Sequence, residues 1–99
     1  MARKLEPKEL DTALTRLPGW ELRDGKLART YRFRDFGDAF AFMAACALRI
    51  HALDHHPEWS NVYSTVKVEL VTHSAKGITA KDVELASVME SIAGRFPEA

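Results

Sequence analysis

Residues 36–53, FGDAFAFMAACALRIHAL, are the most apolar stretch of the sequence and constrain its fold more than any other segment. The apolar residues recur at helical spacing, and Asp35 followed three residues later by Asp38 is a typical helix start. We therefore predict a helix over residues 36–53. Arg49 and His51 interrupt the apolar run, which is atypical of a membrane span, and we expect no membrane partner.

The predicted helix is apolar on two sides. One stripe along it consists of Phe36, Phe40, Met43, Ala47 and Ile50. A second stripe consists of Ala39, Phe42, Cys46 and Leu53. A helix that is apolar on two sides has two surfaces to bury. We expect one surface to pack on a sheet of the same chain and the other to lie against a second subunit, so that helix 36–53 assembles a homodimer or homotetramer.

Helical and strand-like patterns alternate along the rest of the chain. They predict a helix over residues 7–17, strands over 20–22 and 27–33, one long strand over 61–73 and a last helix after residue 79. Asp24-Gly25 marks a hairpin turn between the first two strands, and Thr79 with Asp82 forms a capping pair for the last helix. This order indicates an α+β fold with helices on one face of a small antiparallel sheet. A fourth strand would come from the edges of these segments or from the segment around Trp20.

Composition and charge narrow the class of protein. The 99 residues suit one domain, residues 1–99, and Lys+Arg and Asp+Glu number 14 each, giving a formal net charge of zero. Domains that hold nucleic acid by charge are usually basic, so we expect no nucleic-acid partner. Cys46 is the only cysteine, and residues 1–11 lack the apolar core of a signal peptide. We therefore expect a cytoplasmic protein.

All four histidines lie near one corner of the sequence: His51, His55, His56 and His73. Pro57 disfavours helical backbone at His56, so the adjacent rings of His55 and His56 should diverge and contact different parts of one ligand. His73 ends the predicted long strand. Only the fold, or a second subunit, could bring it back to the other three.

Three interpretations of the histidines stay open on spacing alone. Three of them could bind zinc, because His-x-x-x-His on a helix is a known ligand spacing, although HALDH lacks the glutamate of His-Glu-x-x-His. They could exchange protons with a substrate, because imidazole titrates nearest neutrality. They could also be structural, since a histidine near a helix C-terminus interacts favourably with the helix dipole.

Residues 51–86, HALDHHPEWSNVYSTVKVELVTHSAKGITAKDVELA, resemble the signature of the pterin-4a-carbinolamine dehydratases. The segments PGW, FRDFGDAFAFM and LASVMESIA resemble that family as well, so the similarity covers nearly the whole chain. The signature positions here are His51, His55-His56-Pro57, Tyr63, His73 and Asp82. The resemblance implies a four-stranded antiparallel sheet with three helices packed on one face, assembled as dimers or tetramers. One departure is His51, where many members carry a glutamate.

The resemblance implies removal of water from 4a-hydroxytetrahydrobiopterin, the product left by aromatic amino-acid hydroxylases, to give quinonoid dihydropterin. It implies no metal and no other cofactor. The 4a-hydroxyl leaves as water and N5 loses its proton, so an acid and a base are useful. By resemblance His55, His56 and His73 are catalytic. We expect His56 to be the acid, and His55 or His73 to be the base or to position the substrate.

The resemblance also suggests four substrate-binding residues, Asp54, Trp59, Asp82 and His51. Three of them have simpler explanations: a solvated carboxylate for Asp54, a half-buried aromatic for Trp59 and a helix cap for Asp82. Two other functions are open. Some animal relatives are dimerisation cofactors for a homeodomain transcription factor, and the second stripe of helix 36–53 could bind such a partner. The chain could also be a pterin-binding partner of another enzyme, with little turnover of its own.

Overall fold

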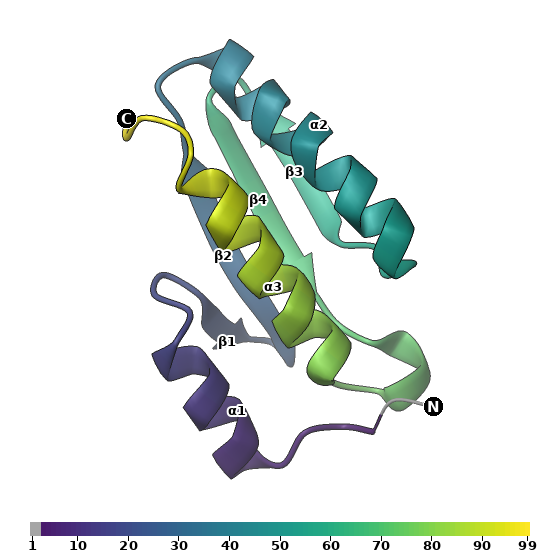
Figure 1. The fold of residues 1–99 in the computed structure, drawn as a ribbon. Helices are drawn as coiled ribbons and strands as arrows, with labels where there is room; N and C mark the ends of the chain where they lie inside the picture. The colour runs from purple at the N-terminus through teal and green to yellow at the C-terminus, as the bar shows by residue number, and fades with distance from the viewer. Residues whose placement is uncertain (1–2) are drawn as a thin grey trace.

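The computed structural model describes residues 3–99 and has an α+β fold, as predicted. Four strands form one antiparallel sheet in the order β1-β2-β4-β3, with the helices on one side of it (Figure 1). The elements are α1 (Pro7–Thr15), β1 (Glu21–Arg23), β2 (Lys26–Arg32), α2 (Phe36–Leu53), β3 (Glu58–Val62), β4 (Thr65–Leu70), the short 3-10 helix η1 (His73–Ala75) and α3 (Ala80–Ala93).

The central strands β2 and β4 carry the core on the face that the helices cover. Leu27 lies opposite Leu70 and Tyr31 opposite Val66, and all four side chains are at most 4% exposed. Side chains alternate between the two faces of a strand, so Ala28 and Thr30 on β2, and Lys67 and Glu69 on β4, point to the face without helices. Lys67 is exposed on that face.

The predicted helix over residues 36–53 is confirmed as α2. The Asp35 side chain caps it by accepting a 2.8 Å hydrogen bond from the backbone N–H of Asp38. By length and composition alone α2, with a mean hydropathy of 1.3, would be long and apolar enough to cross a membrane, a test that core helices of soluble proteins also pass. Here α2 packs along α3 and against β4 (Figure 1).

The hypothesis that the second stripe of α2 binds a partner is wrong. The side buried within the chain consists of Ala39, Phe42, Cys46 and Ile50, each at most 5% exposed. These residues are spaced i, i+3, i+7 and i+11, which keeps them on one side of a helix. The second stripe therefore faces the core and is not free for a partner. The exposed side carries Phe36 and Phe40, 47% and 56% exposed.

The predicted long strand over residues 61–73 is also wrong. Residues 61–73 contain the end of β3, a turn at Tyr63 with φ 51°, and β4, so they are part of a hairpin and not one strand. The Asn61 side chain donates to the backbone carbonyls of Tyr63 and Thr65, at 3.0 and 2.9 Å, and so holds a turn that contains no glycine or proline. Val62 pairs with Thr65 on the helix-free face and is 75% exposed. The fourth strand is therefore β3, directly after the histidine corner.

Cys46 allows a test of the core assignment. Burial raises the pKa of its thiol to about 12, so very little thiolate forms at pH 8. We expect native Cys46 to react with an aromatic disulfide reagent about a hundredfold more slowly than an exposed thiol, and to react fully in denaturant. The matched control is Cys46→Ala/Ala47→Cys, which moves the thiol to an exposed position of α2. Equal native rates for the two proteins would contradict the packing of α2.

Candidate active site

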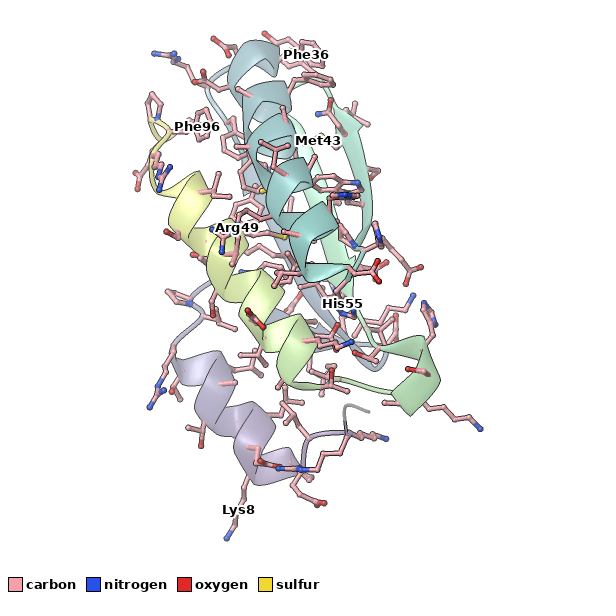
Figure 2. The ribbon with its side chains drawn as sticks, turned by 45° about the vertical axis from the view of Figure 1, so that its right-hand side comes forward. Lys8, Phe36, Met43, Arg49, His55 and Phe96 are labelled. Carbon is pink, nitrogen blue, oxygen red and sulfur yellow. The ribbon has the colours of Figure 1, made fainter. Side chains whose placement is uncertain are left out.

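His55 and Asp82 form a nearly buried pair. α2 ends at Leu53, and Asp54 takes a left-handed conformation (φ 50°, ψ 44°) that turns the chain toward α3. His55 Nε2 then lies 2.6 Å from Asp82 Oδ1, with the two side chains 12% and 0% exposed. Figure 2 shows His55 between the end of α2 and the start of α3. The fold thus joins two predicted site residues that are 27 positions apart.

The other oxygen of Asp82 is bound from two sides. Oδ2 accepts hydrogen bonds from the Thr72 hydroxyl at 2.8 Å and from the backbone N–H of Thr79 at 2.9 Å. The hydroxyls of Thr72 and Thr79 lie 2.7 Å apart, and both residues are buried. The capping role predicted for Asp82 is correct, but its carboxylate has two further partners: the Thr72 hydroxyl and the His55 imidazole. Because it is fully buried, it reaches a ligand through His55.

Thr72 belongs to this cluster although no pattern in the sequence points to it. It follows β4 and pairs with Gly77 across η1, through a backbone hydrogen bond of 3.0 Å from its N–H. Its only signal in the sequence is its place beside His73. Nothing in the spacing indicates that its side chain points inward while that of His73 points outward.

His73 returns to the histidine corner through the hairpin. His73 is the first residue of η1 and is exposed. Its Nε2 lies 3.8 Å from Oε1 of Glu58, the residue that follows Pro57. Glu58 also accepts a 2.8 Å hydrogen bond from Lys26, which lowers the pKa of Glu58 and raises that of Lys26. The return that the sequence left open is therefore made within one chain.

The remaining candidates lie around this corner. His56 is exposed and its Nε2 is 3.7 Å from Asp54 Oδ1, so the two neighbours of His55 face solvent together. His51 is exposed in the last turn of α2. Trp59 is half-buried on β3 opposite Val68 and packs against the core, so only part of its ring is open to a ligand.

Two further observations bear on ligands. Over residues 3–99 no group of three or more His, Cys, Asp or Glu side chains is arranged to hold a metal ion. A depression of about 700 Å³ lies on the helix-free face of the sheet, lined by residues such as Thr30, Ser60 and Lys67. None of the four histidines lines it.

Comparison with known proteins identifies the family. A family model described as pterin 4 alpha carbinolamine dehydratase matches residues 3–92. The chain belongs to this family. A relative from Rhodopseudomonas palustris is 48% identical over 98 residues, covering 97% of each chain. One from Afipia carboxidovorans is 56% identical over 86 residues, covering 85% of this chain and 86% of the relative. Both bear the name "Putative pterin-4-alpha-carbinolamine dehydratase".

The fold of the family is seen in a solved structure as well. The crystal structure of a transcriptional coactivator/pterin dehydratase from Brucella melitensis matches with a TM-score of 0.89 and 46% sequence identity. The match covers 93% of this chain and all of that chain. The resemblance noted from the histidine corner is confirmed for the family and for the fold.

The buried carboxylate should matter for stability. Asp82→Ala leaves the Thr72 hydroxyl and the Thr79 N–H without their acceptor, and we expect the free energy of unfolding to fall by about 2–4 kcal/mol. Urea denaturation followed by circular dichroism measures this. Glu84→Ala, an exposed acid on the same helix, is the matched control and should change it by less than about 0.5 kcal/mol. Similar losses in both variants would mean that the cluster contributes little.

Proposed function

We propose that this protein is a hydro-lyase that converts 4a-hydroxytetrahydrobiopterin to quinonoid dihydropterin by histidine acid/base catalysis. The dehydratase activity is supported by the family and by the names of the relatives. The observation that carries the histidine mechanism is the 2.6 Å contact between His55 and the buried Asp82. An imidazole held by a buried carboxylate is the usual arrangement of a proton-accepting histidine.

The reaction needs one proton added and one removed. The C4a–O bond breaks and the hydroxyl leaves as water after it takes a proton from an acid. The N5–H bond breaks toward a base, and its electron pair forms the N5=C4a double bond. The acid gives one proton and the base takes one, so the net charge of the enzyme does not change. The acid then regains a proton from solvent and the base releases one to it.

The surroundings of the rings favour particular roles. His55 is the best base, because the Asp82 carboxylate stabilises the imidazolium that forms when His55 takes the N5 proton. His56 is the best acid, because its exposed ring exchanges protons freely with water. His73 lies beside Glu58 at the edge of the corner and would position the pterin.

Dehydration of enzymatically generated 4a-hydroxytetrahydropterin, followed by absorbance, tests the proposal. We expect a chelator-resistant rate above the spontaneous reaction, and a loss of about 10²–10⁴-fold in kcat for His55→Gln or His56→Ala. Glu84→Ala, which alters an exposed acid two residues after the buried Asp82, controls for protein quality and should keep the wild-type rate. A wild-type rate no faster than buffer would rule out the activity.

His51 offers a second test, through pH. His51→Glu places a carboxylate in the last turn of α2, four residues before His55, and a nearby carboxylate favours the charged form of an imidazole. We expect the pH–rate profile of kcat/KM to move to higher pH without loss of turnover. A profile identical to that of the wild type would exclude His51 from the site.

We also propose that the chain forms a homodimer or homotetramer through the exposed side of α2. Phe36 and Phe40 are about half exposed, with ring centroids 5.8 Å apart, and Leu48 is 77% exposed. Large apolar side chains grouped on a surface are typical of an interface. The same surface is available to a partner protein, as the description of the Brucella melitensis relative as a transcriptional coactivator suggests. A place in tetrahydrobiopterin recycling rests on the family alone.

Self-association is tested by light scattering after gel filtration. Phe40→Glu puts a charge on the exposed side of α2, and we expect the mass to fall to that of a single chain. Lys8→Glu on α1 also alters surface charge and should leave the mass unchanged. A wild-type protein that is already monomeric at micromolar concentration would contradict the proposal.

A further inference from the structure

The protons of the Thr72–Thr79–Asp82 cluster can be arranged in one way only. Thr72 Oγ1 lies 2.8 Å from Asp82 Oδ2, and a carboxylate can only accept, so the Thr72 hydroxyl donates to Asp82. The Thr72 proton is thereby used. In the 2.7 Å contact between the two hydroxyls, Thr79 must be the donor.

The hydrogen bonds that cap α3 independently show that the Thr79 hydroxyl donates to Thr72. Thr79 Oγ1 accepts from the backbone N–H groups of Lys81 and Asp82, which occupies both of its lone pairs. Its own proton is then free only for Thr72. Two arguments from different neighbours thus give one chain of donors, from Thr79 to Thr72 to Asp82 Oδ2.

This chain decides which nitrogen of His55 carries a proton. Oδ2 is filled by the Thr72 hydroxyl and the Thr79 N–H, so Oδ1 is the oxygen left for the ring, and Nε2 reaches it at 2.6 Å. A carboxylate oxygen facing a nitrogen requires a proton between them. In the neutral ring that proton sits on Nε2, and Nδ1 holds the lone pair.

Nδ1 is also the nitrogen that a ligand can reach. Within residues 3–99 the His55 side chain has no hydrogen bond besides that to Asp82, and Asp38 Oδ2 is the one buried side-chain nitrogen or oxygen without a hydrogen-bond partner. Nδ1 of His55 has no hydrogen-bond partner in the described part of the chain and is not among the buried atoms, so it is in contact with solvent. Nδ1 is thus open to a ligand from solvent, whereas Nε2 is bound to the carboxylate.

We propose that Thr72 is a positioning residue, which acts through Asp82 to hold His55 as the Nε2–H tautomer and so makes Nδ1 the atom that takes the substrate proton. The second half of this inference rests on the proposed dehydratase function. The first half, the tautomer, does not, because it is a property of the free protein.

Nitrogen NMR of the histidine-labelled, substrate-free protein measures the tautomer directly, with His55→Gln to assign the ring. We expect Nε2–H in the wild type. Asp82→Asn gives a sharper expectation: two donors at the Oδ2 position draw the amide oxygen there, and the amide NH₂ then faces Nε2. His55 should therefore switch to Nδ1–H. A wild type in the Nδ1–H form, or an Asn variant that stays Nε2–H, would overturn the inference.

Kinetics of Thr72→Val and Thr72→Ser separate positioning from mere structure. Valine keeps the shape but donates no proton, and we expect kcat per folded molecule to fall about tenfold, with KM within about twofold of the wild type. Serine restores the donor and should restore kcat. A valine variant with wild-type kcat, or a serine variant as slow as valine, would refute the role of Thr72. A failure of all dehydration, with the Nε2–H tautomer present, would refute the proposed function and leave the tautomer standing.

Discussion

The buried carboxylate of Asp82 is the interaction on which the rest of the site depends. Burying an ionised group is costly unless its oxygens are bonded, and here one side of it meets a hydroxyl and a backbone amide while the other meets an imidazole. Its position in the first turn of α3 adds the favourable field of the helix N-terminus. Because its partners come from the start of α3, the segment after β4 and the corner after α2, one side chain holds three separate segments together.

Much of the fold follows from local sequence patterns. The start of α2 at Asp35, the hairpin at Asp24-Gly25 and the cap of α3 are fixed by neighbours within a few residues, and each is where the sequence predicts it. The β3–β4 hairpin escaped prediction because its turn is held by Asn61 and not by glycine. Val62 also continues the even-numbered apolar series of Val66 and Val68, although it is 75% exposed on the opposite face of the sheet, so periodicity gives no sign that the strand has reversed.

The candidate site, like the fold, has a part that the sequence predicts and a part that it does not. The resemblance supplied His55 and Asp82 as separate positions, but their contact joins residues 27 apart and depends on how α2 and α3 are set side by side, which no periodic pattern encodes. Thr72 escaped because a strand-end threonine has no distinguishing spacing. The two apolar stripes of α2 show a related limit: periodicity identifies faces of a helix, whereas only the packed structure shows which face the chain itself covers.

The β3–β4 hairpin has a consequence for how the site assembles. His55 precedes the first strand of the hairpin and Thr72 follows the second, so the two ends of one local supersecondary unit contribute to the same cluster. A slip of one residue in the pairing of β3 with β4 would send Trp59 to the opposite face. It would also shift His55, before β3, by one residue relative to Thr72, after β4. The contact between His55 and Asp82 therefore depends on the register of β3 with β4. A chain with the wrong register could still be compact, but it would lack this site.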